Sequence, residues 1–309
     1  MRCFTKGDSW QASEVPDAAA AVALRSAGPV WIRAGGQRPE VLTELGRLLG
    51  LHPLAVEDAG NARQRPKVES YAGLTFIVLR VPRRDAGGGL TWRQAALFLG
   101  PDFLVSASPE PLAELDRVEG RLEKVGSLAG LFHEALDALV DAWFPYVEER
   151  EEEAESLEDH AAAHPDAATQ ARIRDLKREL STVRKVVPPM RDALLSLERA
   201  EYPNVPPEAR VFLRDVVDHM VRIAERLEYV REVTQIAQEA WNGALAARQN
   251  RVMQRLTVLA ALLLVPSLLA GLGGMNFEGI PDWEYWPVTG TIVGLALIGL
   301  AVAWRQRWL

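Results

Sequence analysis

Two long apolar segments at the end of the chain decide its architecture. The first is LTVLAALLLVPSLLAGLGGMNF at residues 256–277, and the second is WPVTGTIVGLALIGLAVAW at residues 286–304. Neither contains a charged residue, and each is long enough to cross a bilayer as a helix, which takes about 20 residues. The sequence therefore predicts a transmembrane domain with two spans at residues 256–309. The alternative is a hydrophobic hairpin buried in the core of a soluble protein.

Charged residues around the two segments predict their orientation. Arg248, Arg251 and Arg255 precede the first segment, and Arg305 and Arg307 follow the second. The loop between them has no Lys or Arg and carries three acids, Glu278, Asp282 and Glu284. Because cytoplasmic flanks are enriched in Lys and Arg, we expect a multi-pass protein of the plasma membrane with both termini in the cytoplasm.

The composition of the whole chain limits its possible partners. The 309 residues carry a formal net charge of -7, which argues against a nucleic-acid partner and is compatible with cation handling. The single cysteine, Cys3, excludes an intramolecular disulfide and argues against a thiolate zinc site. The first residues, MRCFTKGD, have no apolar signal region, so we expect the part before the spans to be cytosolic.

The N-terminal part of the chain predicts an α+β fold. Strand patterns occur at residues 30–34, 74–81, 90–99 and 103–106, and helix patterns occur at 39–49, where Gly50 ends the helix, and at 52–58. From residue 110 only helical patterns remain, at 110–162 with breaks near Gly126 and Pro145, and at 166–187. We therefore expect an α/β/α cytoplasmic domain with a small mixed sheet and added helices over residues 1–200. The acidic run at 148–155 is interpreted as a solvated helix face.

A long stalk helix is predicted for residues 201–255. Between Pro207 and Pro266 there is no proline, and Gly243 is the only glycine. Apolar or small residues recur every three or four positions at Val216, Met220, Ile223, Leu227, Val230, Thr234, Ala237, Trp241 and Ala244. Such a repeat is typical of a helix that packs against other helices. One helix would then run from the stalk into the membrane, and we expect oligomerisation to help cover its apolar stripe.

Heptad spacing continues into the first span on one uncharged face. This face consists of Asn250, Thr257, Leu264 and Gly271, with Met253, Ala260 and Ser267 interleaved. Around a symmetry axis such a stripe could line a narrow pore. The alternative is ordinary packing of membrane helices, where small and hydroxyl residues also gather. Two spans cannot enclose an ion path alone, so a pore requires several subunits.

Several motifs follow one another along the chain in a fixed order. They are LHPLAVED at 51–58, RPKVE at 65–69, FLRDVVDH at 212–219, NRVMQRLT at 250–257 and GLGGMNF at 271–277. Together with the short acidic loop and the final span, they resemble the CorA superfamily of divalent-cation channels. The resemblance covers nearly the whole chain after residue 30. It implies a homopentamer in the lipid bilayer, with the first span of each subunit lining one pore.

The resemblance also implies an ion-selecting outer mouth at Gly274, Met275 and Asn276. A ring of Asn276 amide oxygens would hydrogen-bond the waters around Mg²⁺, an ion that dehydrates reluctantly. The three loop acids would concentrate cations at this mouth. Entry would be passive and driven by the membrane potential. We expect no enzyme activity and no cofactor other than the transported and regulatory divalent cation.

The resemblance also implies a gate in the pore. Met253, Leu256 and Leu264 would form an apolar constriction that closes by dewetting, with Asn250 at its cytoplasmic end.

A regulatory cation would bind between cytoplasmic domains through carboxylates. Asp215 matches such a position in the stalk, and Asp85 in a hairpin turn is the proposed partner. The alternative for Asp215 is a surface salt bridge with Arg214 or Arg222.

The identity of the ion stays open at this point. Gly273 stands where many members of the superfamily have an aromatic residue, and the loop EGIP at 278–281 resembles the ZntB branch, which is linked to zinc. We therefore consider a Mg²⁺ channel that also passes Co²⁺ or Ni²⁺, and a Zn²⁺ transporter with or without proton coupling. A membrane-anchored enzyme or signalling module is a third class, but the sequence has no catalytic constellation that supports it.

Overall fold

The computed structural model describes residues 1–85, 87, 89–273 and 285–305. These residues divide into two compact units. One unit comprises Met1–Glu158 and Ala171–Ile236, and the other comprises Asp159–Gln170 and Ala237–Leu309.

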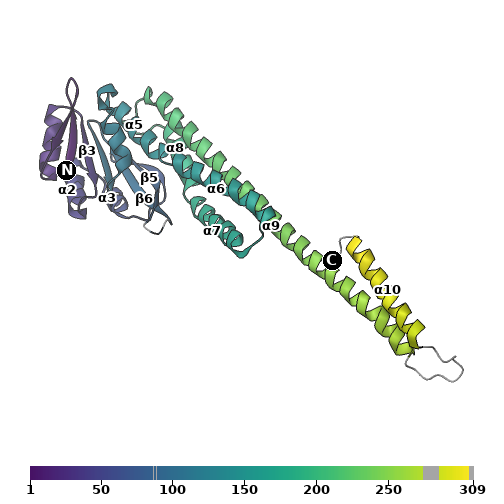
Figure 1. Ribbon diagram of the computed structural model, residues 1–309. Coiled ribbons are helices and arrows are strands. Elements are labelled where there is room, and N and C mark those ends of the chain that lie inside the picture. Colours follow the sequence, from purple (N-terminus) through teal and green to yellow (C-terminus); the bar gives the residue numbers. More distant parts are fainter. Residues whose placement is uncertain (86, 88, 274–284, 306–309) are drawn as a thin grey trace. The chain divides into compact units, whose positions relative to one another are not determined.

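The first unit contains one mixed sheet of seven strands in the order β2-β1-β3-β7-β6-β5-β4 (Figure 1). The strands are β1 Arg2–Lys6, β2 Trp10–Glu14, β3 Val30–Gly35, β4 Lys67–Tyr71, β5 Leu74–Arg84, β6 Leu90–Leu99 and β7 Phe103–Ser108. β3 and β7 pair in parallel, and all other neighbours pair antiparallel. The prediction of a small mixed sheet is confirmed, but β1, β2 and β4 add strands that it lacked.

Helices cover the sheet because its strands carry apolar side chains on both faces. The core beside α1 (Ala18–Ala23), α2 (Pro39–Leu49) and α3 (Pro53–Gly60) includes Ile32, Val78 and Phe98, all of which are buried. α5 (Leu128–Asp141) contacts β5 and β7. As predicted, α2 ends at Gly50, whose positive φ of 70° suits a residue without Cβ.

The region after the sheet is helical, and the breaks predicted near Gly126 and Pro145 are confirmed, because new helices begin at Leu128 and Phe144. Residues 110–127 form short helical pieces, in which the 3₁₀ helices Ala113–Leu115 and Leu122–Lys124 flank α4 (Asp116–Glu119). A further 3₁₀ helix, η1 (Leu24–Ala27), follows α1 in the N-terminal part of the chain. The longer helices are α5, α6 (Phe144–Ala163), α7 (Ala167–Val183) and α8 (Val187–Arg199). Pro145 lies in the first turn of α6. Backbone N–H groups of a first turn have no partner within the helix, so a proline there removes no helical hydrogen bond.

α9 (Ala209–Gly273) is a single helix of 65 residues. It confirms that one helix continues from the stalk into the apolar segment, although it begins at Ala209 rather than at residue 201. The predicted stripe is buried at Val216, Met220, Ile223, Leu227, Val230, Thr234, Ala237 and Trp241. These eight residues are called the buried stripe below. Only Ala244, the last predicted position, is half-buried.

The C-terminal part of α9 has the composition of a membrane span. Among the described residues, α9 alone is long and apolar enough to cross a bilayer; its best window has a mean hydropathy of 2.0 and contains no residue buried within the chain. This exposure argues against a hairpin hidden in a soluble core. Thr289–Arg305, within α10 (Tyr285–Arg305), is a shorter apolar helix.

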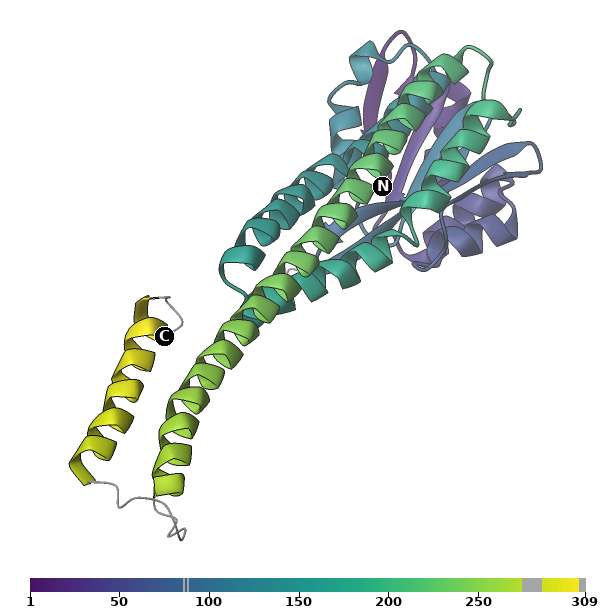
Figure 2. The ribbon, with the colours of Figure 1, turned by 90° about the vertical axis from the view of Figure 1, so that its right-hand side faces the viewer.

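α10 packs beside the last part of α9 (Figure 2). A Cβ built on Gly299 would lie 2.8 Å from Cδ2 of Leu262, so the two helices approach closely at this glycine. Small residues allow such close approach between apolar helices.

Candidate divalent-cation sites

The predicted outer mouth lies outside the described residues. Gly274, Met275 and Asn276, and the loop acids Glu278, Asp282 and Glu284, fall in the segment 274–284. α9 leads directly to this segment, since it ends at Gly273.

The predicted pore-lining residues all lie on α9 and are all exposed. They are Asn250, Met253, Leu256, Thr257, Ala260, Leu264, Ser267 and Gly271, called the exposed stripe below. Leu264 is 67% exposed and Met253 is 61% exposed. Large apolar side chains this open have no partner within the described chain, so lipid or further copies must cover them.

Thr257 gives the exposed stripe a hydrogen-bond acceptor. Its hydroxyl donates a hydrogen bond of 2.9 Å to the carbonyl oxygen of Met253 in the preceding turn. With its proton committed to the helix, Oγ1 presents only lone pairs outward. Such an oxygen can accept from a water bound to a cation.

A second candidate site lies around Asp215, on the N-terminal part of α9. His133, Asp137 and Asp141 stand four residues apart on one face of α5, and Asp215 and His219 stand four apart on α9. Two sets of possible ligand atoms lie within 4.8 Å of one another: His133 with Asp137 and Asp215, and Asp137 with Asp141 and His219. These five residues are called the Asp215 cluster.

His219 joins the two helices of the Asp215 cluster. Its Nδ1 lies 2.8 Å from Oδ1 of Asp141 and 3.3 Å from Oδ1 of Asp137, and its Nε2 lies 3.8 Å from Oδ1 of Asp215. The contact to Asp141 is a hydrogen bond, whereas that to Asp137 is an electrostatic contact only.

Two buried atoms of the cluster lack a hydrogen-bond partner among the described residues, namely Nε2 of His133 and Oδ1 of Asp137. Burial raises the pKa of the Asp137 carboxyl above its ordinary value, and the nearby Asp141 carboxylate raises it further. A cation would relieve both effects, because it gives the buried oxygen a ligand bond and offsets the negative charge.

The two salt bridges considered for Asp215 are wrong. Arg214 pairs with Glu198 instead, at 3.6 Å from Nη2 to Oε1. Across the described residues, no ion pair joins Asp215 to Arg222. The side chain of Asp215 is 64% exposed, so it can contact both the cluster and a second chain.

Asp85 lies in the turn between β5 and β6 and is not brought to Asp215 within one chain. Its Oδ1 accepts hydrogen bonds from the backbone N–H groups of Gly87 (2.9 Å) and Gly89 (2.8 Å). The carboxylate therefore shapes its own turn. Its pairing with Asp215 of another copy stays a prediction.

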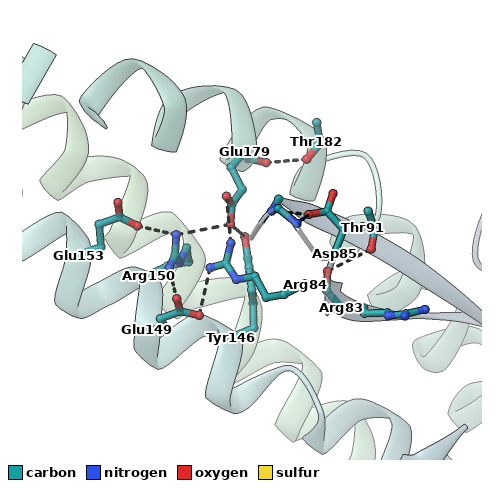
Figure 3. A network of polar contacts seen from close by, with 12 residues as sticks. Arg83, Arg84, Asp85, Thr91, Tyr146, Glu149, Arg150, Glu153, Glu179 and Thr182 are labelled. Carbon is teal, nitrogen blue, oxygen red and sulfur yellow. Dashed lines mark hydrogen bonds and ion pairs between the residues drawn. The ribbon is translucent and has the colours of Figure 1, made fainter. Parts of the chain in front are cut away.

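The base of this hairpin is held by a network of charged residues (Figure 3). Arg84 contacts Glu149 of α6 at 3.0 Å and Glu179 of α7 at 3.6 Å. Arg150 contacts the same two carboxylates, and the hydroxyl of Tyr146 donates to Glu179 at 3.0 Å. This network ties the strand end that precedes Asp85 to two helices.

The acidic run 148–155 is solvated only in part. Glu148, Glu149, Glu152 and Glu155 are exposed, as predicted, whereas Glu151 and Glu153 are half-buried. Glu149 and Glu153 pair with Arg150 of the same helix, Glu151 pairs with Arg226, and Glu155 accepts a hydrogen bond from Tyr229. The sequence showed the acids, but only packing brings Arg226 and Tyr229 of α9 to them.

Comparisons with known proteins show the family and the fold of the chain. The family model described as CorA-like Mg²⁺ transporter protein matches residues 26–306. The chain belongs to this family. The cobalt/magnesium transport protein CorA of Thermotoga maritima is 31% identical over 296 residues, which cover 92% of this chain and 84% of the relative. The zinc transport protein ZntB of Yersinia pseudotuberculosis is 22% identical over 297 residues, covering 91% and 88%.

Solved structures share the fold. The CorA magnesium transporter from Methanocaldococcus jannaschii superposes with a TM-score of 0.84 at 18% identity and covers 100% of this chain and 98% of that chain. The full-length CmaX protein gives a TM-score of 0.73 at 20% identity, with the same coverage. The CorA-like fold, with its soluble α/β domain and long stalk helix, is therefore established for this chain, which belongs to a family of divalent-metal transporters in membranes.

Sequence reasoning missed four members of the Asp215 cluster. His133, Asp137 and Asp141 recur at every fourth position in a helix that is otherwise apolar on that side, and His219 follows Asp215 by four. This repeated spacing was the available signal, but it does not say which two helices meet.

Proposed function

We propose that this protein is a homopentameric channel that carries Mg²⁺, and also Co²⁺ or Ni²⁺, into the cytoplasm. The observation that carries the proposal is the exposed stripe of α9, which is uncharged, polar or small at heptad spacing, and lies in a chain of the CorA-like family. Five such stripes around one axis enclose a path that a single chain cannot. Lipid covers the outer surface, to which α10 contributes the second span, with both termini in the cytoplasm.

Selection takes place at Asn276, and the cation crosses the pore with its inner waters. Neutral amide oxygens hydrogen-bond these waters without stripping them, and they avoid the tight binding that carboxylates at one level would give. The loop acids Glu278, Asp282 and Glu284 raise the local cation concentration. A membrane potential of 100 mV drives a divalent ion inward by about 4.6 kcal/mol, so no nucleotide is needed.

Gating is assigned to the apolar ring and to the Asp215 cluster. Met253, Leu256 and Leu264 close the path when the ring dewets. When cytoplasmic Mg²⁺ is high, the cation occupies the cluster, with Asp85 of a neighbouring chain completing its ligands. A ligand shifts a conformational equilibrium only by the difference between its affinities for the two conformations. The cluster provides this difference, because without the cation its carboxylates repel one another.

The test is ion uptake into vesicles that contain the purified protein. Mg²⁺, Co²⁺, Ni²⁺ and Zn²⁺ are compared side by side for the parent, for Asn276→Ala and for the control Asn242→Ala, which changes an exposed asparagine of the cytoplasmic part of α9. We expect Asn276→Ala to lose selective Mg²⁺ uptake by about 100-fold, a loss of about 2.7 kcal/mol, and Asn242→Ala to keep it. Unchanged Mg²⁺ uptake in Asn276→Ala would refute the role of the amide ring.

Zn²⁺ transport is the second candidate, and the two imidazoles of the Asp215 cluster favour it. Nitrogen ligands suit Zn²⁺, whereas Mg²⁺ prefers oxygen. The similarity to a zinc transport protein points the same way. Uptake of Zn²⁺ without Mg²⁺ would establish this function, and a dependence of uptake on a pH gradient would separate proton symport from channel flow.

A further inference from the structure

A cavity of about 310 Å³ lies between α7, α8 and the adjacent part of α9. Its size is at the lower end of the range for small-molecule sites, which is about 300–1,000 Å³. It belongs entirely to the first unit and is remote in sequence from the exposed stripe. Neither the transport path nor the Asp215 cluster uses any of its lining residues.

The lining of this cavity is basic, although the chain as a whole is acidic. Lys177, Arg184, Arg191 and Arg231 contribute positive charge, against the single carboxylate of Glu228. The last two cations already have anionic neighbours. Arg231 contacts Glu228 at 3.0 Å, and Arg191 contacts the adjacent Asp192 at 3.2 Å.

Two cations of the lining remain without an anion. Within the part of the chain that the structure describes, neither Lys177 nor Arg184 forms an ion pair or a side-chain hydrogen bond. Ser181 stands between them, so the three residues follow one another at positions i, i+4 and i+7 along α7 and the turn that follows it. An ammonium, a hydroxyl and a guanidinium thus line one wall of the cavity.

The lining also has an apolar part, called the apolar floor below. Leu180, Val183, Val187 and Leu227 line the cavity and are buried. Thr234 adds no free donor, because its hydroxyl donates to the carbonyl oxygen of Val230. An occupant therefore meets both apolar carbon and positive charge.

We propose that this cavity binds a small organic phosphate with an apolar or aromatic body. A phosphate offers three acceptor oxygens and up to two negative charges, which match the lysine, the serine and the arginine better than a single carboxylate does. The body of the ligand fills the apolar floor, which inorganic phosphate alone cannot do. Because α7, α8 and α9 all contribute, the bound ligand links the stalk helix to the two helices beside it.

Binding is tested by calorimetry on the full-length protein in detergent, with EDTA present so that no divalent cation takes part. The probe is ADP, with inorganic phosphate and decanoate as comparison ligands. We expect ADP to bind with a Kd below about 1 mM, and phosphate and decanoate to bind at least about tenfold more weakly. The double variant Lys177→Gln/Arg184→Gln should weaken ADP binding by at least about tenfold.

Two further variants keep the test decisive. Lys185→Gln removes a neighbouring exposed cation that does not line the cavity and should bind ADP like the parent. Ala224→Leu fills the cavity without changing its charge and should abolish binding. ADP binding that is absent, unchanged in the double variant, or no tighter than that of phosphate or decanoate would overturn the proposal. The assay measures no ion flux, so its outcome is independent of whether the protein carries Mg²⁺.

Discussion

Two parts of α9 share one helical repeat but differ in what covers them. The buried stripe, from Val216 to Trp241, is covered by other parts of the chain, whereas the exposed stripe, from Asn250 to Gly271, is open among the residues that the structure describes. Periodicity alone therefore does not identify a core. The difference teaches that the first stripe stabilises the single chain, while the second needs a covering from outside it, by lipid or by other copies.

The largest effect is expected from a charge in the buried stripe. Val230 is fully buried, so Val230→Asp places a carboxylate among apolar side chains and should lower the free energy of unfolding by about 4 kcal/mol. Val211→Asp is the control, since Val211 is 70% exposed on the same helix. Thermal unfolding followed by circular dichroism measures both. Equal melting of the two variants would contradict the burial of Val230 in the core of the chain.

The Asp215 cluster tests whether a cation strengthens the packing of α5 against α9. Mg²⁺ at about 100 times its Kd should add about 2.7 kcal/mol to the free energy of unfolding of the parent. Asp137→Asn should lose this gain, whereas the exposed Asp218→Asn should keep it. Stabilisation of Asp137→Asn by Mg²⁺ equal to that of the parent would exclude Asp137 as a ligand.

The raised pKa of Asp137 also gives a pH dependence in the absence of cations. Folding raises this pKa above 3.8, so the folded chain binds the proton more tightly than the unfolded chain. The contribution of this group to stability is therefore greatest at low pH and falls as the pH rises through the raised pKa. Asp137→Asn should flatten this decline in a series of melts in EDTA.

A smaller effect is expected in the exposed stripe. Leu264→Asn should leave the melting of the chain unchanged, because Leu264 has no buried contacts to lose. It should instead raise Mg²⁺ leak at high cytoplasmic Mg²⁺ by about tenfold, or about 1.4 kcal/mol, because a polar ring no longer dewets. A variant that melts early and does not leak would place Leu264 in a core rather than in a pore.

The smallest effect concerns the contact between α9 and α10. Gly299→Ala should lower stability by less than about 1 kcal/mol, since the new Cβ would meet the end of the Leu262 side chain, which can move. Gly294→Ala is the control, because a Cβ there meets no atom within 4 Å. Scanning calorimetry in detergent compares the two, and a larger loss for Gly294→Ala would contradict the observed packing.

Local patterns predicted much of this fold. The repeat in α9, the end of α2 at Gly50 and the strands β3, β5, β6 and β7 all follow from side-chain periodicity and turn chemistry. β1 and β2 were not predicted because they are short and β2 is largely exposed. Their stability depends on pairing, of β1 with β3 and of β2 with β1, rather than on their own residues. The pairing of Glu151 in α6 was missed for a similar reason, since its partner Arg226 lies on another helix.

The amino-acid sequence by itself determined the helical repeat of α9, the apolar segments and the motifs of the CorA-like family, because these depend on residues close together in the chain. Only the tertiary structure decided the parallel pairing of β3 with β7, the meeting of α5 and α9 at the Asp215 cluster, and the basic cavity beside Lys177 and Arg184. The physical reason is that backbone geometry sets which residues share a face, whereas the choice of which faces meet depends on burying apolar surface across the whole chain.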